Sequence, residues 1–118
     1  MTLLELLQKW SELEPDRCTV GVIDDCVQVF LGKNGWRIFH LNEVLSEAVV
    51  QVAVQEAILS HGLPFRLENY GSGYVALLLH PDTFDVQYQA NYAKAAIALL
   101  EAYLQWLEHE RGVDPCQS

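Results

Sequence analysis

The chain has 118 residues, and its 16 acidic and seven basic side chains give a formal net charge of −9 at pH 7. This length is typical of one domain with a single hydrophobic core. The charge argues against direct binding of DNA or RNA, because contacts to phosphates require clustered Lys and Arg side chains. The acidity is explained by solubility or, as an alternative, by a basic partner.

The cysteines are Cys18, Cys26 and Cys116, an odd number at irregular spacing. Such a set does not form a disulfide framework, so we expect reduced thiols. The first residues lack the pattern of a signal peptide. Charged and amide side chains interrupt every apolar run before it reaches the roughly 20 residues of a membrane-spanning helix. We therefore expect a cytoplasmic protein that does not contact a membrane.

The chain begins with an amphipathic segment over residues 3–13, in which Leu and Trp recur at helical spacing. Thr2 and Glu5 have the spacing of a capping box at its start. Pro15 should end the helix, because the residue before a proline avoids helical backbone angles.

Three antiparallel strands are expected next, over residues 18–23, 26–31 and 36–41. Asp24-Asp25 is the expected two-residue turn between the first two strands, and it would place Cys18 opposite Leu31. The Gly-Lys-Asn-Gly sequence that follows predicts the second turn, because Asn and Gly both tolerate positive φ.

Residues 42–61 are apolar on almost every side of a helical wheel. Asn42 as an N-cap, Gly62 as a stop and a length near 20 residues favour a helix, although residues 50–55 alternate as a strand would. A helix that is apolar most of the way round must be covered on more than one side. We therefore expect a central helix, a subunit interface, or both.

The second half repeats the order of strands followed by a helix. Residues 64–70 and 74–80 predict a hairpin, 83–88 a further strand, and 89–110 a long helix, with a loose tail over 113–118. We interpret residues 1–112 as one α+β domain. Its expected architecture is an antiparallel sheet of five or six strands, packed on one face against two long helices and one short N-terminal helix.

Two stretches, EAILSHGLPFRLENYGSGYVALLL and NYAKAAIALLEAYL, carry a family resemblance. Residues 44–107, which contain them, have the order helix, glycine, strand, Gly-rich turn, strand, short strand and Ala-rich helix. This order resembles small phage-borne α/β-sandwich proteins of no established activity. The resemblance implies an accessory protein of a phage or mobile element, and it assigns no functional residue.

The candidate motifs for catalysis or metal binding lack the spacing or the structural context that their chemistry requires. Gly71-Ser72-Gly73 lacks the spacing of a nucleophile elbow, and the Gly-rich turn at 32–35 lacks that of a phosphate-binding loop. The carboxylate pairs fall in expected turns, where Asp has a structural role. The histidines are isolated from one another: His40, His61, His80 and His109. We expect no catalytic residue, no metal site and no cofactor.

The remaining hypothesis is a non-enzymatic binding protein that acts through protein–protein contact or self-association. Aromatic and Arg side chains near strand ends predict a binding surface, because these residues anchor interfaces. It comprises Trp36, Arg37, Tyr70 and Tyr74. Apolar positions of the two long helices predict a homodimer interface, which comprises Val49, Val50, Val54, Leu100, Tyr103 and Leu107.

Two alternatives stay open. One is a small-ligand-binding domain with a pocket between sheet and helices, lined by Trp36, Tyr74 and Trp106. The other is an acidic inhibitor that docks on a basic nucleic-acid-binding protein. This second alternative predicts that five acidic residues gather on one face: Glu43, Glu47, Glu56, Asp82 and Asp85.

Overall fold

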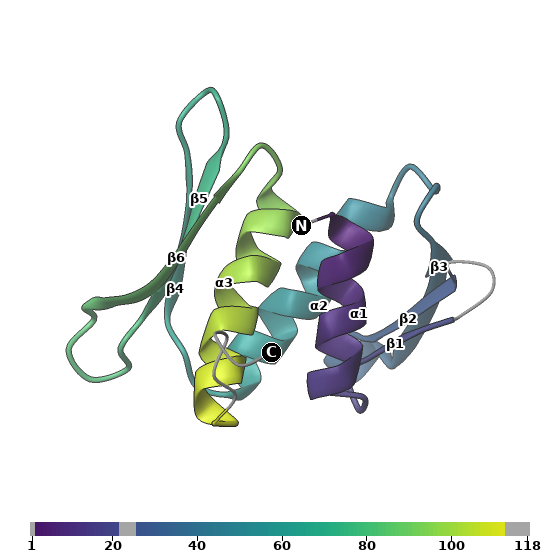
Figure 1. Ribbon diagram of the computed structural model, residues 1–118, viewed down its shortest axis with the longest axis horizontal. Coiled ribbons are helices and arrows are strands. Elements are labelled where there is room, and N and C mark those ends of the chain that lie inside the picture. Colours follow the sequence, from purple (N-terminus) through teal and green to yellow (C-terminus); the bar gives the residue numbers. More distant parts are fainter. Residues whose placement is uncertain (1, 22–25, 113–118) are drawn as a thin grey trace.

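The computed structural model describes residues 2–21 and 26–112. The elements in chain order are α1 (Leu3–Leu13), β1 (Cys18–Val20), β2 (Cys26–Phe30), the 3₁₀ turn η1 (Gly32–Asn34), β3 (Trp36–His40), α2 (Ser46–Ser60), β4 (Phe65–Asn69), β5 (Tyr74–Leu79), β6 (Val86–Tyr92) and α3 (Ala95–Glu110). The strands form two separate antiparallel sheets, with orders β1-β2-β3 and β4-β5-β6. The helices lie between the sheets, one sheet on each side (Figure 1).

The α+β class is confirmed, but the expected single sheet of five or six strands is wrong. Two three-stranded sheets take its place, and helices pack between them instead of on one face. α3 contacts β5 and β6 on one side and α1 and α2 on the other, while α1 packs on β1. The helical layer is therefore apolar towards both sheets, and each sheet buries one face against it.

The N-terminal helix agrees with its prediction. α1 spans Leu3–Leu13, and the Thr2 side chain accepts a hydrogen bond from the Glu5 backbone N–H while the Glu5 carboxylate accepts one from the Thr2 backbone. Leu6, Leu7 and Trp10 carry its buried face. These side chains enter one core that all three helices and both sheets share.

The long apolar segment forms a shorter helix than expected. α2 begins at Ser46, and Asn42 lies in a turn instead of capping it. Ser46 Oγ donates to the Leu41 carbonyl oxygen at 3.2 Å, so this side chain stabilises the turn before the helix. The N-cap position is Leu45, which makes no side-chain hydrogen bond.

The last helix also begins later than predicted, because residues 89–92 belong to a strand. β6 runs to Tyr92, and α3 begins at Ala95. Tyr88, Ala90 and Tyr92 alternate along β6 and pair with apolar residues of β5. Residues 88–92 therefore follow the two-residue apolar period of a strand, and the helical period begins only after them, so the predicted helix started too early.

The first hairpin has a register different from the expected one. Cys18 pairs with Val29, not with Leu31, and the Gly21 N–H donates to the Cys26 carbonyl oxygen. A shift of two residues keeps every side chain on its expected face. Asp-Asp lacks the glycine that two-residue hairpin turns favour. Asp24-Asp25 itself, like the tail 113–118, lies outside the described residues.

Candidate functional site

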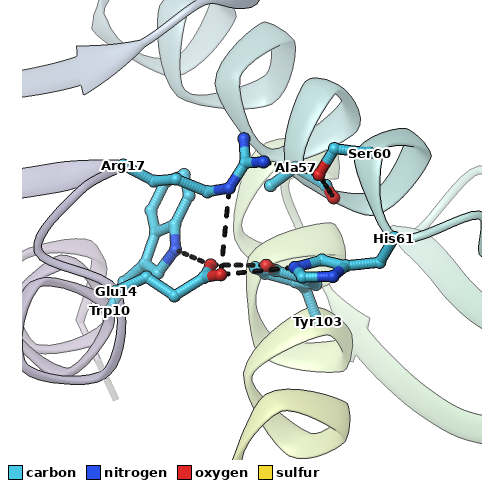
Figure 2. A network of polar contacts seen from close by, with 7 residues as sticks. All are labelled: Trp10, Glu14, Arg17, Ala57, Ser60, His61 and Tyr103. Atoms are coloured by element: carbon cyan, nitrogen blue, oxygen red, sulfur yellow. Dashed lines mark hydrogen bonds and ion pairs between the residues drawn. The ribbon is translucent and has the colours of Figure 1, made fainter.

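A cluster of polar side chains surrounds the carboxylate of Glu14, at the C-terminal end of α1. Glu14 is only 3% exposed. Trp10 Nε1 donates to its Oε1 at 3.0 Å, and the Tyr103 hydroxyl from α3 donates to the same oxygen. His61 Nε2 lies 3.3 Å from Glu14 Oε2, and Figure 2 shows these groups converging from three segments of the chain. The carboxylate thereby joins α1, the end of α2 and α3.

Arg17 extends this cluster towards α2. Its Nε lies 3.8 Å from Glu14 Oε2, and its Nη2 donates to Ser60 Oγ at 2.6 Å. Its guanidinium also lies over the Phe30 ring, 5.9 Å from the ring centroid. The cation therefore neutralises the buried carboxylate, which would otherwise carry a large desolvation penalty.

The cluster contains a serine, a histidine and a carboxylate, but it is not arranged as a catalytic triad. Ser60 Oγ donates to the Ala57 carbonyl oxygen at 2.7 Å, so its proton is not directed at His61. A nucleophile must hydrogen-bond to its base to be activated. Burial and the hydrogen bond to Glu14 raise the pKa of Tyr103, which keeps this hydroxyl a donor. These hydrogen bonds hold the three helices together, and we call the Glu14 cluster in this structural role a brace between the helices.

The Cys18 thiol is equally unsuited to nucleophilic chemistry. It is fully buried, and its Sγ lies 3.7 Å from the Leu7 carbonyl oxygen. Burial raises its pKa to about 12. A reactive cysteine has instead a lowered pKa and access to solvent. In the part of the chain that the structure describes, no group of three metal-ligating side chains is found.

The predicted binding-surface residues lie on two different sheets. Tyr70 and Tyr74 line an open cleft of about 380 Å³ at the β4–β5 turn, together with Tyr92 of β6. Trp36 and Arg37 lie on β3, in the other sheet, and both are exposed. The four residues therefore do not form one surface.

The predicted subunit interface lies mostly inside the chain. Five of its residues are in the core, with at most 2% exposure, and have no surface to offer a second copy: Val50, Val54, Leu100, Tyr103 and Leu107. Val49 is half-buried and lines a groove beside α2. The core positions belong to the faces by which α2 and α3 pack on each other and on the sheets.

The opposite side of α2 carries an exposed apolar surface, which we call the α2 stripe: Leu45, Ala48, Val52 and Leu59. Leu45 and Leu59 are each 62% exposed and Val52 is 49% exposed. Residues at these spacings share one helix face. Val44, at 98% exposure, adjoins the stripe in sequence. Exposed apolar side chains grouped in this way mark sites of interaction with other molecules.

A groove of about 210 Å³ lies between the α2 stripe and β3. Leu31 and Arg37 form one wall, and Leu45, Ala48, Val49 and Val52 form the other. Glu56 lies further along α2, where its carboxylate rests against Gly32 so closely that a Cβ there would collide with it. Among residues 2–21 and 26–112, neither Arg37 nor Glu56 forms an ion pair. A positive and a negative charge thus flank the same apolar surface.

The residues named by the ligand-pocket hypothesis and by the acidic-inhibitor hypothesis do not gather in one place. Tyr74 lines the clefts beside β5, whereas Trp36 lies on the other sheet and the Trp106 ring packs against His61 in a tilted arrangement. The acidic residues are spread in the same way. Glu47 pairs with Lys94 at 2.6 Å, Glu56 lies against η1, and Asp82 and Asp85 lie in the turn between β5 and β6.

Comparison of the chain with protein-family models, with curated proteins and with solved structures finds no match. Within the described ranges, every helix is too short or too polar to cross a membrane.

Sequence reasoning missed both the Glu14 cluster and the α2 stripe. The four-residue spacing of Trp10 and Glu14 on α1 was a signal for the first, since such pairs share a helix face. The stripe had no separate signal, because apolar residues occupy nearly all sides of α2 and the sequence does not say which side is covered.

Replacement of Tyr103 by Phe tests the brace. We expect Tyr103→Phe to lower the free energy of unfolding by about 1–3 kcal/mol, because Glu14 loses a buried hydrogen-bond donor. Tyr70→Phe is the matched control, since its hydroxyl donates to Glu68 at an exposed position, and we expect a change within about 0.5 kcal/mol. Urea denaturation measures both, and equal effects would contradict the brace.

Because the Cys18 thiol is buried, we expect the folded chain to lose stability in alkali. Its pKa is raised from 9.0 to about 12 in the folded chain, so above pH 9 the unfolded chain loses its thiol proton first and unfolding becomes easier. At pH 10 this contribution is on the order of 1 kcal/mol. We expect Cys18→Ala to lose less stability between pH 8 and pH 10 than wild type, whereas Cys26→Ala should follow wild type. Identical pH slopes in all three proteins would refute the assignment.

Proposed function

We propose that the chain is a non-enzymatic, cytoplasmic binding protein that acts through protein–protein contact, and that the α2 stripe is its contact surface. The partner that we propose is a second copy of the chain. The observation that carries this proposal is the exposure of Leu45, Val52 and Leu59 on a helix whose other side is buried in the core. The composition supports it too, because only 19% of residues are charged, below the roughly 25% of an average protein.

Burial of this stripe supplies a driving force for association. Full burial of an exposed Val or Leu side chain contributes about 1.5–3 kcal/mol. A two-fold symmetric contact buries the same residues on both copies, so each position counts twice. Val44 and the groove beside β3 enlarge the area beyond the helix itself.

The charges around the stripe favour a second copy over an unrelated partner. A chain with a net charge of −9 repels its own copies at long range. Arg37 and Glu56 offset this repulsion at the contact, because they place a positive and a negative charge beside the stripe, so that each can face the opposite charge of a second copy. Isologous contacts require such self-complementarity.

Replacement of Val52 by Glu tests the proposal. We expect the wild type to be a dimer at micromolar concentration and Val52→Glu to raise the dimer dissociation constant at least ~100-fold, because two carboxylates would be buried without partners. Val86→Glu is the control, since Val86 is 53% exposed at the start of β6 and lies on the other sheet. Sedimentation velocity over a concentration series measures both. If the wild type is still a monomer at a concentration 100-fold above the micromolar range, self-association is refuted.

A further inference from the structure

We infer that, in the dimer proposed above, the two α2 helices cross in antiparallel directions, with Val52 near the two-fold axis and Arg37 of each copy against Glu56 of the other. This inference rests on the proposed self-association, and it adds the orientation and the residue pairs that specify the partner.

Val52 is the centre of the α2 stripe. Leu45 precedes it by two helical turns, about 10 Å along the axis, and Leu59 follows it by the same rise. Both lie within about 20° of Val52 around the helix, since two turns of an α-helix take close to seven residues. An antiparallel crossing centred on Val52 therefore places Leu45 of one copy level with Leu59 of the other, and the apolar stripe meets itself along its whole length.

Arg37 and Glu56 lie on the same flank of α2, the one that faces the first sheet. Arg37 shares a groove with Leu31 and with four residues of the helix and its start, Leu45, Ala48, Val49 and Val52, so it is level with the stretch that ends at Val52. The Glu56 carboxylate rests against Gly32, the neighbour of Leu31 in sequence, and is level with the part that follows Val52. The two charges stand on opposite sides of the centre along the axis.

The symmetry of the contact then decides which charges meet. A two-fold axis perpendicular to α2 reverses the direction of the helix but preserves its flank, so Arg37 meets Glu56 of the other copy, and the pair forms twice. A two-fold axis parallel to α2 preserves the level but exchanges the flanks, so Arg37 and Glu56 of the two copies lie at different levels on opposite flanks and form no pair. Opposite charges at an interface fix register and orientation, and like charges oppose it. The antiparallel arrangement is therefore favoured.

A charge-reversal cycle tests this orientation. We expect Arg37→Glu and Glu56→Arg each to raise the dimer dissociation constant about 10-fold or more, because each creates two like-charge contacts. The double variant Arg37→Glu/Glu56→Arg should return to within about threefold of wild type. Losses that simply add in the double variant would overturn the antiparallel pairing while leaving self-association intact. A monomeric wild type would overturn the proposed function as well.

Disulfide trapping gives a second readout that does not depend on the charges. In a background with Cys26→Ala and Cys116→Ala, we expect Leu45→Cys chains mixed with Leu59→Cys chains to crosslink to each other on mild oxidation. Val52→Cys chains should crosslink to themselves. Circular dichroism of each variant confirms folding. Efficient crosslinking of Leu45→Cys to itself, without crosslinks to Leu59→Cys, would show a parallel crossing and overturn the inference.

Discussion

The structure depends on one constraint, which is that α2 is apolar on more sides than its own chain covers. Its inner side packs Val50, Val54 and Ile58 into the core, where α3 and the first sheet cover them. Its outer side places Leu45, Val52 and Leu59 in water. The two sheets lie on either side of the helical layer (Figure 1). They bury much of the apolar surface of the three helices, but the α2 stripe stays exposed. A second copy of the chain is the occupant that we propose.

The Glu14 cluster fixes which side of α2 stays outside. Glu14 binds Trp10 on its own helix, Tyr103 on α3 and His61 directly after α2, while Arg17 reaches Ser60 in the last turn of α2. Hydrogen bonds to a buried carboxylate are directional, so they constrain how the three helices meet in a way that apolar packing does not. A buried ionic group contributes little net stability, and in this protein we interpret its role as fixing a unique arrangement of the helices.

Much of the local structure could be predicted from the sequence, because it depends on neighbouring residues. The capping box at Thr2, the stop before Pro15 and the hairpins β2–β3 and β4–β5 all follow from such short-range rules. The number of sheets could not be predicted, since strand patterns show which face is apolar but not which strands pair. The side of α2 that stays exposed could not be predicted either. Val50 and Val52 are the same residue type two positions apart, and only the fold buries one and exposes the other.

The most direct test of the central claim is an isotope-filtered NOE experiment on a mixture of labelled and unlabelled chains, which detects contacts between copies alone. We expect intermolecular NOEs between the Val52 methyl groups of the two copies and between Leu45 of one copy and Leu59 of the other. Their absence, or intermolecular NOEs confined to exposed apolar residues elsewhere such as Ile38 or Phe84, would contradict the central claim.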